Sequence, residues 1–357
     1  MGQQGKHLNS IKVSHEKHTA GCATEIMAIP ETVCISMSQH IGAPCKPLVK
    51  KGDQVKVGQL IGDTDAFVSA PIHSSVSGTV KEISTIRSVT GGDDQVVIIE
   101  TDGNQDVYEE IKPPVINDMK DFIAAVRASG LVGLGGASFP THIKLNPKNL
   151  EEVDTLIVNA AECEPFITSD HRLMLENTEY IIKGAVAIMK HLGLKKGHIG
   201  VEENKPDAIE KLRKVIADMG HSGDIEVNVL RARYPQGAER VMIYEITGKT
   251  LRAGMLPADV GVLLSNVTTI AFIGQYLEIG DVYKRQARRC MADRIADEIG
   301  DDLLDPLRID DDHGVWDYIY FSRYRMPGCC DVEFSLLDQL LHDVRSVVLV
   351  KFVFHGL

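Results

Sequence analysis

From residue 118 onward, the hydrophobic positions switch repeatedly between a helical and a strand-like period. Apolar residues at every third or fourth position predict an amphipathic helix over residues 118–128. Residues 155–160 are a short apolar run, which is typical of a buried strand. A second apolar stripe predicts one helix over residues 170–192, ended by Gly193. The alternation continues with a strand, a helix that starts at a proline, and another strand: residues 199–202, 206–219 and 225–230.

Strands and helices that alternate over short connections predict an α/β domain with a parallel sheet. Ligands of such sheets bind beyond the carboxyl ends of the strands. The segments expected there are Asn159-Ala-Ala-Glu-Cys-Glu-Pro165, Glu202-Glu203 and Arg231-Ala-Arg-Tyr-Pro-Gln-Gly-Ala-Glu239. Two more apolar segments, residues 241–246 and 260–273, are predicted to be helical, although polar Asn266-Val-Thr-Thr269 interrupts the second.

Residues 35–100 differ from this pattern, because they alternate short β segments with turn dipeptides. Glycines stand where tight turns need positive φ: Gly52, Gly58 and Gly78. The half-motifs Gly52-Asp-Gln-Val-Lys-Val-Gly-Gln-Leu-Ile61 and Ala70-Pro-Ile-His-Ser-Ser-Val-Ser-Gly-Thr-Val80 resemble the flattened barrel of lipoyl and biotinyl carrier domains. Carrier domains place a modified lysine between the two halves, whereas residues 63–67 contain none. The resemblance therefore implies a docking or scaffolding module.

Composition limits the class of protein. The chain has 357 residues, of which 44% are hydrophobic and 25% charged, as in ordinary globular proteins. A net charge of −12 with no basic block argues against a nucleic-acid surface. Seven scattered cysteines without a C-x-x-C indicate a reducing, cytosolic setting. No apolar run approaches the ~18 residues of a membrane span, so we expect a soluble chain that can still dock on a membrane protein.

Two polar stretches separate the regions. The double proline of Lys112-Pro-Pro114 predicts a linker. Residues 1–30 are expected to form an extended arm, and its irregularly spaced His7, His15 and His18 favour solvated side chains over a metal site. The predicted division is an arm, a barrel-sandwich domain, an α/β domain and a tail of different character: residues 1–30, 31–103, 115–280 and 281–357.

The richest candidate site is the segment Gly130-Leu-Val-Gly-Leu-Gly-Gly-Ala-Ser-Phe-Pro-Thr-His-Ile-Lys144. Its glycines leave backbone N–H groups open to a ligand, Phe139 offers a flat apolar surface and Lys144 a cation. That inventory suits a phosphate beneath an aromatic ring system. The ordinary Rossmann arrangement does not fit, because a helix and not a strand precedes the loop. The alternative is a tight turn with a solvated lysine.

Five motifs in one order resemble the C subunit family of the Rnf electron-transport complex, over roughly residues 6–280. The α/β part is also similar to the flavoprotein subunit of respiratory complex I. The motifs are Ser38-Gln-His-Ile-Gly-Ala-Pro44, Gly133-Leu-Gly-Gly-Ala-Ser-Phe-Pro-Thr-His-Ile-Lys144, Asn159-Ala-Ala-Glu-Cys-Glu-Pro165, Tyr234-Pro-Gln-Gly-Ala-Glu239 and Leu256-Pro-Ala-Asp-Val-Gly-Val262. The fold class implied is α/β: a barrel-sandwich β domain plus a complex I flavoprotein-like domain with a parallel sheet.

The resemblance implies a subunit on the cytoplasmic face of the cell membrane that binds FMN and NAD(H). It would pass electrons to two [4Fe-4S] clusters in a complex that couples ferredoxin:NAD⁺ oxidoreduction to Na⁺ or H⁺ transport. Other Rnf subunits and ferredoxin-linked carriers would be its partners. Hydride transfer to a flavin needs no protein acid or base. By motif, the flavin phosphate would be held by Gly133, Gly135, Gly136 and Lys144, the flavin lined by Asn159, Tyr234, Gly237 and Asn266, and the nicotinamide nucleotide faced by Phe139, Glu164 and Glu239.

Several positions depart from the complex I pattern: Leu134, Ser138, His142, Ala161 and Ala238. The family also continues into a β-grasp domain and two C-x-x-C-x-x-C-x-x-x-C-P cluster motifs. The match here stops near Gly280, and no cluster ligands are found in the sequence that follows. A chimeric or frame-shifted reading frame is our preferred interpretation of residues 281–357, over a genuine new domain.

Structural alternatives remain for single residues and for the whole chain. Glu162 and Glu164 could cap the next helix together with Asp170. Cys163 is expected to be a packing residue. The chain could be a flavin-dependent electron-transfer subunit, a truncated non-catalytic scaffold, or a soluble partner of another reductase. Retention of FMN distinguishes the first from the second.

Overall fold

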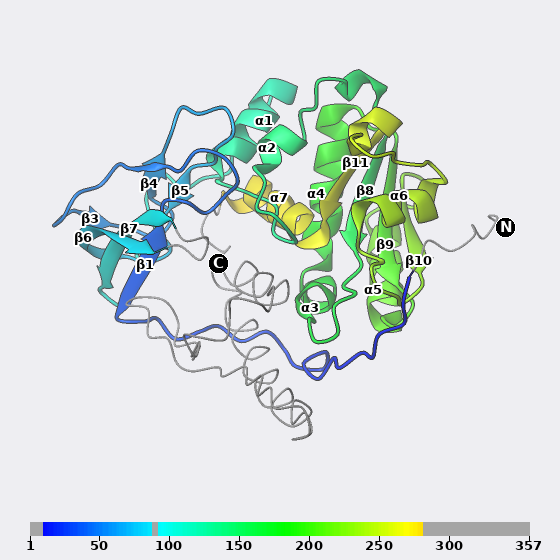
Figure 1. The fold of residues 1–357 in the computed structure, drawn as a ribbon, viewed down its shortest axis with the longest axis horizontal. Coiled ribbons are helices and arrows are strands. Elements are labelled where there is room, and N and C mark those ends of the chain that lie inside the picture. Colours follow the sequence, from blue (N-terminus) through cyan, green and yellow to red (C-terminus); the bar gives the residue numbers. More distant parts are fainter. Residues whose placement is uncertain (1–9, 88–91, 281–357) are drawn as a thin grey trace, which may run out of the picture. The chain divides into compact units, whose positions relative to one another are not determined.

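The computed structural model describes residues 10–87 and 92–280, which divide into two units (Figure 1). One unit, here the β unit, comprises residues 24–111. The other, the α/β unit, comprises residues 112–280 and also residues 10–23 of the described chain. The prediction for residues 281–357 lies outside the described part.

The β unit holds two small antiparallel sheets. The larger has the order β1-β7-β6-β3, with β1 Thr32–Ser36, β3 Gln54–Val55, β6 Gly78–Arg87 and β7 Asp93–Thr101. The smaller has the order β2-β4-β5, with β2 Lys46–Pro47, β4 Leu60–Asp63 and β5 Ile72–His73. Aliphatic side chains from both sheets, among them Val33, Ile61 and Ile99, form one core.

The turn prediction is confirmed at Gly52 and Gly58 of the β unit, whereas Gly78 is the first residue of strand β6. Gly52 and Gly58 have φ of +90° and +80°, in the left-handed region that favours glycine. Gly78 is required for a second reason, because a Cβ there would lie 2.0 Å from the carbonyl oxygen of Glu100 on β7. The half-motif glycines therefore stand at two turns and at one close approach between paired strands of this unit.

The α/β unit is built on a parallel sheet of order β10-β9-β8-β11. Its strands are β8 Thr155–Ala160, β9 Lys196–Glu202, β10 Ile225–Leu230 and β11 Val262–Asn266. Its helices are α1 Met119–Ala128, α2 Thr141–Lys144, α3 Ser169–Glu176, α4 Thr178–Leu192, α5 Pro206–Asp218, α6 Glu239–Thr247 and α7 Val267–Ile279, with short 3₁₀ turns η1 Leu150–Glu152 and η2 Pro257–Val260.

Helices cover both faces of this sheet. A Cβ at Gly197 of β9 would meet Met189 of α4, whereas one at Gly200 would meet Met242 of α6. Residues an odd number of positions apart on a strand point to opposite faces, so α4 and α6 lie on opposite sides. The predicted α/β alternation is thus a sheet buried between helices.

Two helix predictions were wrong. Residues 170–192 form two helices, since Asn177 between them has φ −129° and ψ 34° and ends α3 as α4 begins. Asparagine side chains favour such non-helical breaks. The apolar segment 260–273 is not one helix either: Val262–Asn266 is the strand β11, paired with β8, and α7 follows it. A short apolar run does not distinguish a buried strand from a buried helix.

Residues 10–30 of the arm are extended as predicted, apart from one turn near residue 20. One expectation for its histidines was wrong, because both ring nitrogens of His15 are shielded from solvent and have no partner among the described residues. The reason is that this part of the arm packs on the α/β unit instead of lying in water. His18 is about half exposed beside Glu16, and His7 lies outside the described residues.

Candidate functional site

All four strands of the α/β unit are parallel, so the segments that follow them meet at one edge of the sheet. The Asn159 side chain at the end of β8 donates to the Gly237 carbonyl, with Nδ2 and O 2.8 Å apart. Asn266 at the end of β11 is paired in register with Asn159. The structure therefore brings together three residues that the sequence assigned to the flavin.

The glycine segment closes into a loop at this edge. Val132 bridges Pro140, the Gly133 N–H donates to the Phe139 carbonyl at 2.9 Å, and the Leu134 N–H donates to Thr269 Oγ1 of α7 at 3.0 Å. Within the described part of the chain, no N–H of residues 135–138 makes a hydrogen bond of normal geometry. Successive unpaired N–H groups of this kind form an anion-binding concavity.

The loop glycines are not equivalent. A Cβ at Gly135 would come within 2.6 Å of the Asn266 side chain, so only glycine allows this approach. Nothing lies within 4 Å of a Cβ at Gly136, and the nearest atom at Gly133 is at an ordinary 3.7 Å. Ser138, one of the positions that depart from the complex I pattern, has φ +52°, in the left-handed region.

Both the oxygen and the nitrogen of the Asn266 side-chain amide make hydrogen bonds. Its Oδ1 accepts from the Thr268 N–H at 2.8 Å and so caps α7, while its Nδ2 donates to Asp170 Oδ2 at 2.7 Å. The second oxygen of Asp170 accepts from the Thr268 hydroxyl at 2.6 Å. Asp170 thus joins α3 to α7, which the sequence did not indicate because the two residues lie far apart along the chain.

The predicted phosphate cation already has an anionic partner. Lys144 Nζ lies 2.9 Å from Oε1 of Glu239, the first residue of α6, and each side chain is about one third exposed. The sequence assigned Lys144 to the phosphate and Glu239 to the nucleotide. The ion pair shows that Lys144 and Glu239 lie side by side, and it holds the lysine at the edge of the sheet.

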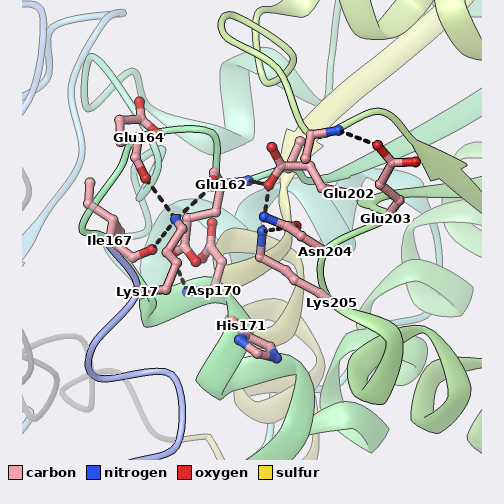
Figure 2. A network of polar contacts seen from close by, with 12 residues as sticks. Lys17, Glu162, Glu164, Ile167, Asp170, His171, Glu202, Glu203, Asn204 and Lys205 are labelled. Carbon is pink, nitrogen blue, oxygen red and sulfur yellow. Dashed lines mark hydrogen bonds and ion pairs between the residues drawn. The ribbon is translucent and has the colours of Figure 1, made fainter. Parts of the chain in front are cut away.

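The loop after β8 carries two glutamates, Glu162 and Glu164, and residues 161–163 at its start are buried (Figure 2). Glu162 is 3% exposed, and its Oε1 accepts from the Asp170 N–H at 2.8 Å, so the expectation that it caps the next helix is confirmed. Its own N–H donates to Glu202 Oε2 at 3.1 Å, and the same oxygen lies 2.5 Å from the buried Lys205 ammonium. Burial, and next the charge of Asp170, raise the pKa of Glu162 to about 7, although Lys17 and Lys205 oppose the shift.

Three residues of this network were missed or only partly noticed from the sequence: Lys17, Glu202 and Lys205. Only Glu202 carried a signal, as an acidic residue at a predicted strand end. Cys163 is buried, and burial raises the pKa of its thiol, which agrees with a packing role.

The remaining predicted residues lie around the same edge. A Cβ at Gly237 would be 2.9 Å from the Ala161 carbonyl oxygen, so the loops after β8 and β10 touch there. Tyr234 lies in the second loop, Glu164 in the first, and Phe139 is half-buried in the glycine loop. Gln236, 5% exposed, was not predicted, and its Nε2 has no acceptor among the described residues.

The residues present fit a phosphate-bearing aromatic cofactor. Residues 135–137 are exposed, and the N–H groups of residues 135–138 make no hydrogen bond of normal geometry among the described residues, so they are open to a ligand phosphate. Gln236 Nε2 is a buried donor without an acceptor there, and a ligand carbonyl oxygen would satisfy it. Lys144 adds a cation beside the loop. Within the described residues, no group of His, Cys, Asp and Glu side chains could hold a metal ion.

Comparison with known families defines the class of each unit. Residues 6–104 match the RnfC barrel sandwich hybrid domain, and residues 126–275 match the Nuo51 FMN-binding domain. Both the barrel-sandwich prediction and the flavoprotein-like prediction for the fold are confirmed. The parallel sheet with its glycine loop thus belongs to a class of domains whose cofactor is FMN.

Relatives narrow the class to one family. The C subunit of the proton-translocating ferredoxin:NAD(+) oxidoreductase complex of Clostridium ljungdahlii is 44% identical over 269 residues, 74% of this chain and 58% of that protein. The C subunit of the Na(+)-translocating complex of Acetobacterium woodii is 46% identical over 270 residues, 74% of this chain and 60% of that protein. The C subunit of the ion-translocating oxidoreductase complex of Rhodobacter capsulatus is 36% identical over 72% of this chain and 50% of that protein. This chain belongs to the RnfC family, the C subunits of Rnf complexes, and spans about 60% of the first two relatives.

Proposed function

We propose that this chain is the flavin- and nucleotide-binding part of the C subunit of an Rnf-type complex, and that it transfers electrons between NAD(H) and iron–sulfur carriers. The observation that carries the proposal is the loop of unpaired N–H groups at residues 135–138, fixed against Asn266 in a segment that matches an FMN-binding domain. Bound FMN would accept a hydride and release single electrons.

The chain's own residues bind and orient the cofactor. The N–H groups of residues 135–138 would donate to the phosphate, and Lys144 would add its positive charge. Asn159, Tyr234, Gly237 and Asn266 would line the flavin, while Phe139, Glu164 and Glu239 would face the nucleotide. The ion pair between Lys144 and Glu239 would orient both side chains before the ligands arrive.

Partners and location follow from the relatives' names. The C subunits of C. ljungdahlii and A. woodii are named as parts of ion-translocating ferredoxin:NAD(+) oxidoreductase complexes. The proposed partners are accordingly the other subunits of such a complex and ferredoxin-linked carriers, at the cytoplasmic face of the membrane. No helix among the described residues is long and apolar enough to cross a membrane.

Titration of the full chain with FMN, followed by flavin fluorescence, tests the proposal. The informative variant is Gly136→Ala, because its Cβ meets nothing in the free protein and any loss of affinity reports a ligand close to that backbone. Gly223→Ala is the matched control, since that glycine also faces open space but lies next to β10 at the amino edge of the sheet.

We expect FMN binding by the wild type and the control, and about tenfold weaker binding by Gly136→Ala, which corresponds to about 1.4 kcal/mol. Equal FMN affinity in all three proteins would show that the glycine loop does not contact FMN. Absence of binding by the folded wild type would favour the scaffold alternative.

A further inference from the structure

Residues 11–20, called the strap below, run along the α/β unit although the whole β unit follows them in the sequence. Ile11 and Tyr234 exchange two backbone hydrogen bonds of 2.9 Å each. The Glu16 N–H donates to the Pro165 carbonyl at 3.1 Å, and Arg172 of α3 donates to the Ala20 carbonyl at 3.0 Å. The strap therefore contacts both the loop after β10 and the loop after β8.

Lys17 is the central contact of the strap (Figure 2). Its ammonium donates to the carbonyl oxygens of Glu162, Glu164 and Ile167 at 2.9, 2.7 and 2.5 Å. An ammonium has three N–H donors, so all of them are used on one loop. Burial lowers the pKa of Lys17, and the nearby charge of Glu162 opposes that shift.

The loop that Lys17 binds has no regular structure of its own. Residues 161–168 contain neither helix nor strand, so their carbonyl groups have no ladder partners. Three of those carbonyls converge on the ammonium instead. Thr19 adds a second link, because its hydroxyl lies 2.5 Å from that of Thr168, and both side chains are buried. Removal of the ammonium would take one donor away from each of these three carbonyl oxygens.

The loop after β8 and the loop after β10 also depend on each other. Gly237 lies against the Ala161 carbonyl, and the Gly237 carbonyl accepts from the Asn159 side chain. A change in the first loop would therefore move the second, which contains Tyr234. The strap contacts the backbone of Tyr234 and of Glu164, which are both residues of the proposed cofactor and nucleotide site.

We infer that the strap fixes the shape of these two loops, with Lys17 as its positioning residue, and so sets the affinity of the α/β unit for FMN. The inference rests on the proposed function for its cofactor. The strap falls within residues 6–104, which match the barrel-sandwich family model, yet its contacts assign it to the α/β unit.

The test compares Lys17→Ala with Lys12→Ala in the full chain. Lys12 is the matched control, because it is an exposed lysine of the same strap. The first measurement is hydrogen exchange of residues 161–168 and 231–238 without FMN, and the second is FMN titration. We expect faster exchange in both loops and about tenfold weaker FMN binding for Lys17→Ala alone. Added n-propylammonium, which matches the three carbons and the ammonium lost on truncation to alanine, should restore part of both, because a merely structural loss would not respond to it.

Unchanged hydrogen exchange of the two loops in Lys17→Ala would overturn the inference that the strap fixes their shape. Faster exchange with unchanged FMN affinity would overturn the inference that Lys17 positions the loops for FMN. If the wild type binds no FMN, the proposed function fails. The hydrogen-exchange result and its rescue by the amine then still decide whether the strap fixes the two loops. Should Lys17→Ala not fold, Thr19→Val removes the link to Thr168 with little change of shape. It is then judged by the same exchange and affinity measurements.

Discussion

Glu162 is a carboxylic acid in a place that disfavours its charge. It is buried beside the charge of Asp170, and Lys17, Lys205 and the Asp170 N–H compensate only in part, so its pKa is raised from 4.5 to about 7. Between these values the folded protein holds a proton that the unfolded chain has released. Stability from this group is therefore fully present below pH 4.5 and is lost as the pH rises through about 7.

Glu162→Gln should remove this pH dependence. The amide keeps an oxygen to accept from the Asp170 N–H but does not ionise. We expect the wild type to lose of the order of 2 kcal/mol more than the variant between pH 5 and pH 8. Urea unfolding followed by helical circular dichroism measures it, since every described helix lies in the α/β unit. Glu210→Gln, at an exposed position on α5, is the control, and equal slopes for the wild type and Glu162→Gln would contradict the assignment.

Single residues of the site were predictable to different degrees. The glycine loop and the strand-end asparagines carried local motifs, and the structure gathers them at one edge. Lys17 carried no signal, because its partners are backbone carbonyls in a distant loop and any lysine looks solvated in a polar arm. Asp170 could be recognised as a helix-start residue but not as the partner of Asn266.

At the scale of elements, α4 and α7 pack unusually closely. A Cβ at Gly184 would lie 2.0 Å from the Ile270 carbonyl oxygen, and one at Gly274 would lie 2.2 Å from that of Tyr180. The two helix backbones therefore touch at a pair of glycines. In an exposed helix, alanine is favoured over glycine by about 0.5–1 kcal/mol, so here two effects compete.

In Gly184→Ala, we expect the steric clash to outweigh the gain in helix propensity. Overpacking of this kind costs about 1–3 kcal/mol, more than the gain in helix propensity, because the obstructing atom belongs to the backbone and cannot rotate away. The free energy of unfolding should fall in Gly184→Ala and stay nearly constant in Gly223→Ala, whose new methyl group meets nothing. A stabilised Gly184→Ala would show that the two helices can separate without cost.

Elements were predictable where local pattern and environment agree. Residues 155–160 are an apolar run of strand length, and residues 225–230 alternate apolar and polar side chains. They form β8 and β10. The pattern failed at β11, whose apolar residues continue directly into the buried helix α7. Only the sheet decides the boundary, because pairing with β8 extends the chain up to Asn266, and the asparagine side chain then starts the helix.

On the scale of the whole molecule, the proposed cofactor site draws on two separate parts of the sequence. The sheet, its loops and the glycine segment come from residues 112–280, and the strap comes from residues 11–20. A polar arm ahead of a barrel gave no sequence pattern that would assign it to the distant α/β unit. In the sequence, the β unit thus stands between the two segments that form the proposed site. Each unit has its own hydrophobic core.

This arrangement predicts how truncation affects FMN binding. A chain of residues 1–280 contains the strap, the glycine loop and all four strands, so it should bind FMN with the affinity of the full chain. A chain of residues 112–280 lacks the strap and should bind FMN more weakly, by at least the roughly tenfold expected for Lys17→Ala. Parallel titrations by flavin fluorescence, with circular dichroism to verify folding, measure both. Binding by the full chain alone would mean that residues 281–357 contribute to the site, and our interpretation of that tail as a chimeric or frame-shifted sequence would then be wrong.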